Sequence, residues 1–308
     1  MAGYKLATYQ TKEGPRAGLI IDDKVFDAAK LTGKAAYSTV LAIITDWSAA
    51  KGVLKAAAAK APKSRVKGLP LGKTKLRAPL LWPYTIFCAG SNYADHAAEM
   101  AHKMNRPMEP DPHTQGLKAW HFIKAARAVT DPGATVKISN ISDRVDWEIE
   151  LAAVIGRPAR DVPESKALSY VAGYTCANDL SARDRGPRPN ISDTAPFKHD
   201  WTKHKSFDGS CPLGPWIVPA ADIRDPQNLG LKLWVNGVLK QDSNTKHMIF
   251  NLAEQIAQLS NGMTLQPGDL ILTGTPAGVG AGRGEFLKKG DVVKIWIEKI
   301  GELTNKIA

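Results

Sequence analysis

The sequence predicts an α+β protein that is rich in β-structure, and three observations support this fold class. Short apolar and β-branched runs bounded by Gly, Pro, Asn or Asp recur along the chain, from residues 4–10 to residues 292–298. Clear helical periodicity is confined to the long segments 38–60 and 248–260. Asn236-Gly237 separates two apolar runs and is a strong hairpin signal. Many short strands with few helices favour a β-rich core over a doubly wound parallel sheet.

The composition is typical of a globular protein with one large domain, or one large and one small domain. The chain has 308 residues, of which 44% are hydrophobic and 23% charged. Its three cysteines, Cys88, Cys176 and Cys211, form no CxxC motif, which argues against a disulfide framework or zinc site and for a reducing compartment. No run approaches the length of a membrane span, and the first residues lack the apolar segment of a signal peptide. We therefore expect a cytoplasmic protein without a membrane partner.

The formal net charge of +11 requires an explanation. Part of the excess lies in residues 51–77, which contain nine Lys or Arg and no acidic residue. Nucleic acid is one candidate partner, but the chain shows no recognition-helix signature, zinc finger or basic motif interleaved with aromatics. A positive field also attracts small anionic substrates, and a merely solvated basic face is an equal alternative. We expect a small anionic substrate and no nucleic-acid partner.

The first residues predict a small α+β domain. Strand-like runs at residues 4–10, 17–23 and 24–29 are separated by Gly14-Pro15 and Asp22-Asp23, a hairpin pattern. Residues 38–60 have helical periodicity, and Pro62 ends the segment. A Pro, Gly and Lys-rich connector follows. These features place a boundary near residue 75, with a small domain at 1–75 and a main domain at 76–308.

The main domain opens with a strand at residues 85–89, followed by Gly90 and a segment that contains His96 and Glu99. Side chains three apart share one face of a helix, so this carboxylate can orient the imidazole and raise its basicity. The pair predicts a general base, and the alternative is a surface contact within a helix. Residues 102–117 are polar, contain three prolines and predict a lid-like loop. Strands are expected at 119–123 and 136–139.

Acidic residues mark two further strands. Residues 146–156 predict a strand on which Glu148 and Glu150 lie on the same face. Adjacent carboxylates repel each other unless a cation lies between them, and Mg²⁺ prefers oxygen ligands. For a lone Glu-x-Glu pattern, a solvent-facing strand is the better explanation, so a second acidic position is needed to support a metal site. Asp179, at the end of a predicted strand at 169–179, is a candidate.

The remaining segments predict further β-structure around a few candidate polar residues. Lys205 precedes a turn, a hairpin is expected at 231–235 and 238–241, and a helix at 248–260. Residues 270–276 predict a strand that ends in a Gly-rich turn. The glycine-rich stretch at 278–284 fits neither a P-loop nor GxGxxG, and we expect a flexible loop there. The absence of GxSxG argues against a serine hydrolase. Strands at 292–298 and after Gly301 complete the domain.

The order of these segments resembles the fumarylacetoacetate hydrolase family over about residues 80–305. The matching blocks are SNYADHAAEM, DWEIELAAVIG, YTCANDLSARD, KSFDGSCPLGPW, VNGVLKQ, LQPGDLILTGTPAGVG and LKKGDVVKIWIEKIG. The resemblance implies a mixed β-roll catalytic domain, a homodimer, and Mg²⁺ (or Mn²⁺ or Ca²⁺) held by Glu148, Glu150 and Asp179. It implies that His96 and Glu99 activate water, and that Arg183, Lys205 and Thr275 contact an anionic substrate. Lys205 is also expected to assist catalysis by offsetting negative charge.

The activity implied by the resemblance is metal-dependent hydrolysis of a carbon–carbon bond in an acylpyruvate-like or β-diketo acid, through a metal-bound enolate. Isomerisation or decarboxylation of a related oxo-dicarboxylate is the alternative. A third hypothesis is a nucleic-acid-binding protein built on an inactive enzyme scaffold. The joint presence of Glu148, Glu150, Asp179, His96 and Glu99 argues against this hypothesis. The chain departs from the family at Gly186, where relatives often carry glutamine, and this departure concerns the substrate end of the pocket.

Overall fold

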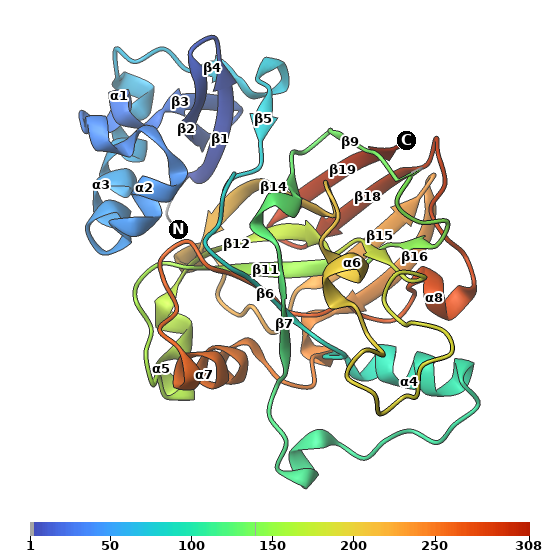
Figure 1. Cartoon of the computed structure of the whole chain (residues 1–308). Coiled ribbons are helices and arrows are strands. Elements are labelled where there is room, and N and C mark those ends of the chain that lie inside the picture. Colours follow the sequence, from blue (N-terminus) through green and yellow to red (C-terminus); the bar gives the residue numbers. More distant parts are fainter. Residues whose placement is uncertain (1–2, 139) are drawn as a thin grey trace.

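A computed structural model describes residues 3–138 and 140–308, and it confirms the β-rich α+β fold class. Within these residues the largest sheet has twelve strands (Figure 1). Its main path is β4 (Leu69–Pro70), β3 (Lys24–Asp27), β2 (Gly14–Ile21), β1 (Lys5–Thr11), β14 (Cys211–Pro219), β12 (Val171–Asn178), β11 (Ile149–Ile155), β17 (Leu270–Leu272), β6 (Ile86–Ala89) and β7 (His121–Lys124). In addition, β5 (Leu76–Arg77) pairs with β1, and β8 (Val129–Thr130) pairs with β14.

The second sheet of the described chain has five strands and packs against the middle of the first. Its order is β16 (Val238–Asn244), β15 (Gly230–Val235), β18 (Val292–Ile297), β19 (Gly301–Ile307) and β9 (Thr135–Val136). The strand predicted at 136–139 is therefore shorter, and Ser139 lies outside the described residues. Buried side chains such as Leu151, Leu233 and Ile295 fill the space between the two sheets. A short ribbon of β10 (Val145–Asp146) and β13 (Ser181–Ala182) lies beside the acidic strand.

The first strands form an antiparallel meander covered by helices, as the hairpin pattern predicts (Figure 1). The covering helices are α1 (Ala28–Thr32), α2 (Val40–Thr45) and α3 (Trp47–Lys60). The pairing of Leu6 in β1 with Ile217 in β14 joins this region to the rest of the twelve-stranded sheet. One buried apolar cluster runs across the junction and contains both Leu54 and Leu213. The boundary near residue 75 stays a prediction.

The helical periodicity of residues 38–60 is confirmed, but the segment forms two helices that meet at Asp46. Asp46 has φ −99° and ψ 23°, outside the helical range, and its carboxylate accepts a hydrogen bond from the Tyr37 hydroxyl at 2.5 Å. Aspartate has low helix propensity because its side chain competes for nearby polar groups. Apolar periodicity continues through such a break, so the pattern alone does not reveal it.

The hairpin at Asn236-Gly237 is confirmed. Asn236 and Gly237 both have positive φ angles, 52° and 80°. This is the combination that a two-residue type I′ turn requires and that Asn-Gly adopts at low cost. The turn fixes the register of β15 on β16, and it thereby places Gln241 of β16 beside the acidic strand.

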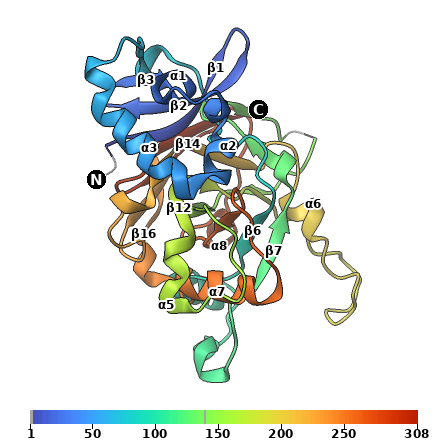
Figure 2. The same cartoon turned by 90° about the vertical axis from the view of Figure 1, so that its left-hand side faces the viewer.

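The remaining helices surround the rim of the sheets: α4 (Ala94–Lys103), α5 (Glu164–Ala167), α6 (Trp201–Lys205), α7 (Leu252–Gly262) and α8 (Gly280–Arg283). Asn251 and Glu254 form a capping box that starts α7. Residues 104–118, here called the lid loop, extend from α4 and contain one 3₁₀ turn, Pro112–Gln115 (Figures 1 and 2). None of the helices described here has the length and apolar character needed to cross a membrane.

Candidate active site

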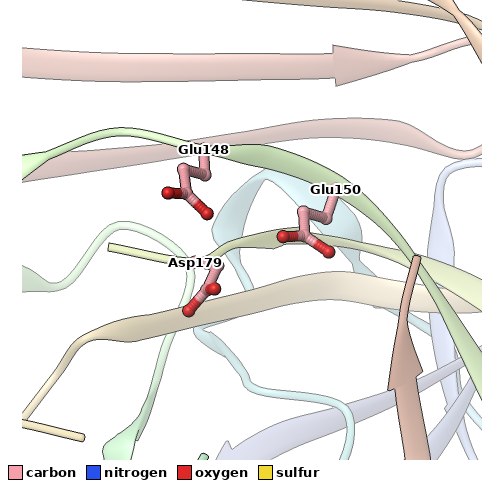
Figure 3. Close-up of side chains that lie close together, drawn as sticks. All are labelled: Glu148, Glu150 and Asp179. Carbon is pink, nitrogen blue, oxygen red and sulfur yellow. The ribbon is translucent and has the colours of Figure 1, made fainter. Parts of the chain in front are cut away.

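Three carboxylates from two neighbouring strands converge in the interior (Figure 3). Glu148 directly precedes β11, Glu150 lies in β11, and Asp179 directly follows β12. Antiparallel pairing of these strands places Asp179 beside Glu148, and the Asp179 N–H donates to the Glu148 carbonyl at 2.9 Å. One oxygen of each carboxylate lies within 4.8 Å of the other two. The strand alternation that predicted a shared face for Glu148 and Glu150 thus describes the observed arrangement.

Three basic side chains surround these acids. Lys205 Nζ lies 2.8 Å from Glu148 Oε2 and 2.6 Å from Asp179 Oδ2. Lys124 Nζ lies 2.5 Å from Asp179 Oδ1, and its side chain has no exposed surface. Arg183 bonds Glu148 through Nη2, at 2.5 Å. The buried acids are therefore held by specific charged partners, which is the usual condition for keeping charge in a protein interior.

The pKa values of the two glutamates are shifted in opposite directions. Burial opposes the negative charge of Glu148. The positive charges of Lys205 and Arg183 outweigh this effect of burial and lower the pKa of the Glu148 carboxyl to about 2. Burial raises the pKa of Glu150 well above its ordinary value, and the nearby carboxylates of Asp179 and Glu148 raise it further. A bound cation would remove the repulsion that disfavours the charged form of Glu150.

The donor set fits a divalent metal ion. Glu148, Glu150 and Asp179 offer three buried carboxylates, the oxygen ligands that Mg²⁺ and Mn²⁺ prefer. Together with Asp146, the acids outnumber the surrounding cations Lys124, Lys205 and Arg183 by one. A divalent ion would reverse the sign of that excess and leave a site that attracts an anion.

His96 and Glu99 form the pair that their spacing predicts on α4. His96 Nδ1 lies 3.3 Å from Glu99 Oε2, and both side chains are partly buried. The backbone N–H of Gly278 donates to both Glu99 oxygens, at 2.9 and 3.0 Å. Burial opposes the charge of Glu99, but His96 and Gly278 outweigh it and lower the pKa of this carboxyl. An anionic Glu99 holds a proton on Nδ1, so Nε2 is the nitrogen that can accept one.

The glycine-rich stretch is an ordered part of the site, so the expected flexible loop is wrong for residues 280–283. These residues form α8, and the N–H groups of Gly280 and Ala281 donate to the Asp146 carboxylate at 2.5 and 2.9 Å. Asp146 is fully buried and also bonds Arg183 Nε at 2.9 Å. The Asp146 carboxylate holds these N–H groups and orders the stretch. The glycine content alone does not indicate this order.

Thr275 is positioned by a buried glutamine. Gln241 Nε2 donates to Thr275 Oγ1 at 2.9 Å and to the Pro276 carbonyl at 2.8 Å. Its Oε1 accepts from the N–H of Ile149 at 3.1 Å, between the two glutamates. Gln241 therefore connects the acidic strand to the loop after β17, and Thr275 can donate its own hydroxyl proton.

Two adjoining cavities meet at Ser91 and His96. The smaller, of about 90 Å³, is lined by Ala89, Gly90, Ser91, His96, Trp120, Phe122, Glu148, Arg183, Trp201, His204, Lys205 and Thr275. The larger, of about 580 Å³, lies between α4 and the lid loop and is lined largely by apolar residues such as Met100, Met108 and Met248. A ligand head group beside the acids can therefore continue past His96 into a roomier apolar space.

The structure brings together all eight residues singled out in the sequence: His96, Glu99, Glu148, Glu150, Asp179, Arg183, Lys205 and Thr275. It also adds residues that sequence reasoning missed: Lys124, Asp146, Gln241 and His204. Asp146 stands in the same acidic segment, and Lys124 directly follows the apolar pair Phe122-Ile123, so each left a weak signal. Gln241 and His204 stand in polar runs that do not distinguish them.

Comparison with known proteins gives consistent matches. Residues 85–308 match the family described as fumarylacetoacetate (FAA) hydrolase, C-terminal. The chain is 39% identical to human mitochondrial oxaloacetate tautomerase FAHD2B over 252 residues, covering 81% of this chain and 74% of that protein. It is 39% identical to 2,4-didehydro-3-deoxy-L-rhamnonate hydrolase from Sphingomonas sp. (strain SKA58) over 257 residues, covering 82% and 84%.

A solved structure also aligns along nearly the whole chain. It is maleylpyruvate hydrolase from Sphingobium sp. SYK-6 in complex with manganese(II) ion and pyruvate, which is 30% identical with a TM-score of 0.73 and covers 98% of each chain. This likeness extends over the first 84 residues, which the family match at 85–308 does not include.

Proposed function

This chain belongs to the fumarylacetoacetate hydrolase family, and from that premise we propose that it is a metal-dependent hydrolase of carbon–carbon bonds in acylpyruvate-like or other β-diketo acids. The observation that carries the proposal is the position of His96. It borders the small cavity that contains Glu148, Arg183 and Lys205 and also the larger apolar cavity under the lid loop. A general base at this junction suits a reaction at a carbonyl between an anionic head group and an acyl tail.

Different residues of the site have different roles in the reaction. His96 Nε2 accepts a proton from water while Glu99 holds the Nδ1 side of the ring. The water oxygen adds to the distal carbonyl, and the bond between that carbon and the next carbon of the head group breaks. Its electron pair stays with the three-carbon fragment, which takes back the proton from His96 and leaves as the enol and then the keto form of pyruvate. The other product is a carboxylic acid. Arg183 and Lys205 offset the negative charge that develops.

A divalent cation held by Glu148, Glu150 and Asp179 would supply Lewis-acid polarisation of the oxo-acid oxygens. Lys205 orients two of these carboxylates, and Gly274 donates its N–H to Glu150 at 2.6 Å. We propose Mg²⁺ as the ion, with Mn²⁺ or Ca²⁺ as substitutes. The buried carboxylate set and the solved relative with manganese(II) and pyruvate support a divalent ion at this site.

A second candidate function is isomerisation or decarboxylation of a small oxo-dicarboxylate. The small size of the cavity lined by Glu148, about 90 Å³, favours a short ligand such as oxaloacetate. The 39% identity to an oxaloacetate tautomerase supports it equally. In the isomerisation, His96 would move a proton between carbon and oxygen without adding water. In the decarboxylation, CO₂ leaves and the enolate that remains takes up a proton, so the same residues serve both candidates.

A substrate panel separates the two functions. Acetylpyruvate, fumarylpyruvate and oxaloacetate would each be incubated with Mg²⁺ or with chelator, while the enol absorbance and the pyruvate formed are followed. Chelator-sensitive release of pyruvate from a diketo acid supports the hydrolase. Chelator-sensitive tautomerisation or decarboxylation of oxaloacetate, with no cleavage of the diketo acids, supports the second candidate.

We also propose that the protein is a homodimer. Trp82, Tyr84 and Ile123 are large apolar residues with at least 60% of their surface exposed, and Ile123 lies on β7 at the edge of the main sheet. Exposed apolar groups of this size are typical of protein interfaces. Light scattering during gel filtration tests the assembly state directly.

A further inference from the structure

The imidazole of His204 is buried beside the acidic site without a hydrogen-bonding partner. The residue is only 5% exposed and borders the small cavity together with Arg183 and Lys205. Neither of its ring nitrogens has a partner among the described residues. Buried polar atoms are rarely left unpaired, because the loss of hydration is not compensated. A group that enters the cavity would compensate it.

Local packing holds this imidazole at the cavity wall. His204 lies in α6, and its ring stacks on Trp201 with a centroid distance of 5.5 Å and an interplanar angle of 24°. Gly186 provides the necessary space. A Cβ atom at position 186 would lie 2.7 Å from His204 Nδ1, closer than real Cβ contacts occur. Glycine at position 186, where relatives often carry glutamine, thus leaves the space that the His204 ring occupies.

The ring is neutral over the physiological pH range. Burial lowers the pKa of His204 to about 3, and the positive charges of Lys205 and Arg183 lower it further. A neutral imidazole carries one N–H donor and one acceptor. The N–H donor of His204 lies beside the cations Arg183 and Lys205, and together these groups can donate hydrogen bonds to an anionic oxygen. Neutral histidines polarise bound carbonyl groups in the same way.

We propose that His204 is a substrate-binding residue that donates a hydrogen bond to the oxygen-rich head group of the 2-oxo acid, beside Arg183 and Lys205. The assignment rests on the proposed function, since it takes the oxo-acid head group to occupy the small cavity. It makes the pair Gly186 and His204 a determinant of how tightly this enzyme holds the head group.

Two substitutions at position 204 test the role of the nitrogens. Phenylalanine keeps a ring that can stack on Trp201 but removes both nitrogens, whereas glutamine restores an N–H donor without the ring. We expect H204F to bind pyruvate roughly 10- to 100-fold more weakly than the wild type, the loss typical of one hydrogen bond to a charged group. The H204F protein should melt at the same or a higher temperature, because two unsatisfied buried atoms are gone. H204Q should recover part of the pyruvate affinity.

A double-mutant cycle with Gly186 tests the geometry. G186A should weaken pyruvate binding by displacing the imidazole, and it should have little further effect in an H204A background, where the space is free. The measurement is calorimetric titration of the Mg²⁺-loaded proteins with pyruvate. Equal pyruvate affinity in wild type, H204F and G186A would overturn the role of His204 and leave the proposed function intact. If the wild type itself binds no pyruvate, the head-group assignment and the proposed function both fall.

Discussion

Gly278 donates its backbone N–H to both carboxylate oxygens of Glu99, so the loop after β17 fixes the residue that orients His96. The two residues are 179 positions apart in the chain. The contact connects α4, which carries the proton acceptor His96, to the loop that carries Thr275. In the same loop, the backbone N–H of Gly274 donates to the Glu150 carboxylate. The orientation of His96 is therefore coupled to the acidic centre through the backbone and not only through side chains.

The charge of Glu99 is expected to matter more than its shape. E99Q keeps an oxygen that can accept from Gly278 but loses the negative charge that supports a proton on His96 Nδ1. We expect kcat to fall by roughly 10²- to 10⁴-fold, as for loss of general base catalysis. Metal affinity should be unchanged in E99Q and in H96N. An equal loss of metal binding in H96N would mean that His96 is a ligand or a structural residue.

Removal of one carboxylate should abolish the effect of metal on stability. Saturating Mg²⁺ or Mn²⁺ should raise the melting temperature of the wild type, since a ligand at 100 times its Kd adds about 2.7 kcal/mol. E150Q should fold and show no such rise, because one of the three converging oxygen donors has lost its charge. Differential scanning calorimetry with and without metal checks this. D242N, at an exposed carboxylate that belongs neither to the triad nor to the lining of the small cavity, is the matched control and should respond like the wild type.

Lys124 is expected to be the most sensitive basic residue for stability. K124M removes the buried partner of Asp179 and should cost about 3 kcal/mol of unfolding free energy, as is typical when one half of a buried pair is lost. Added metal should restore part of this loss by pairing with Asp179. K232M removes an exposed ion pair with Asp242 and should change stability by less than about 0.5 kcal/mol. Urea unfolding of both variants, with and without Mg²⁺, measures these differences, and similar values for the two would contradict the assignment.

The lid loop should loosen as the pH rises. His113 in this loop lies 2.8 Å from Glu254 of α7 and 2.9 Å from Asp111, and hydrogen bonds to Glu254 and then Asp111 raise its pKa. A raised histidine pKa means that the contact is fully present below the ordinary value near 6.5 and is lost as the pH rises through the raised value. Hydrogen exchange of residues 106–116, corrected for its intrinsic pH dependence, should show protection falling over that range. H113Q should remove the pH dependence, and an unchanged profile in H113Q would exclude this latch.

Local patterns predicted the site where its geometry is local. Alternation on a strand placed Glu148 beside Glu150, and helical spacing placed His96 beside Glu99, because both relations depend on one element only. The turn at Asn236-Gly237 was predictable because two residues determine its backbone angles. The grouping of these pieces into one site came from the family resemblance and not from any of these patterns.

The missed features are those that depend on distant partners. Lys124 meets Asp179 across 55 positions, and Gln241 meets Thr275 across 34, so neither appears within a sequence window. The glycine-rich stretch is ordered by Asp146, which lies 134 positions before Gly280. The break at Asp46 was missed for a different reason, since apolar periodicity continues across it.

The origin of the oxygen in the released acid tests the central claim most directly. The Mg²⁺-loaded enzyme would be incubated with acetylpyruvate in ¹⁸O-water, and the products analysed by mass spectrometry. Hydrolysis by water at the site of His96 predicts equal amounts of pyruvate and acetate, with at least one ¹⁸O in each acetate, and loss of both products with chelator or in H96N. Metal-dependent interconversion of the keto and enol forms, with no labelled acetate, would contradict the hydrolase and leave the isomerase as the function of this site.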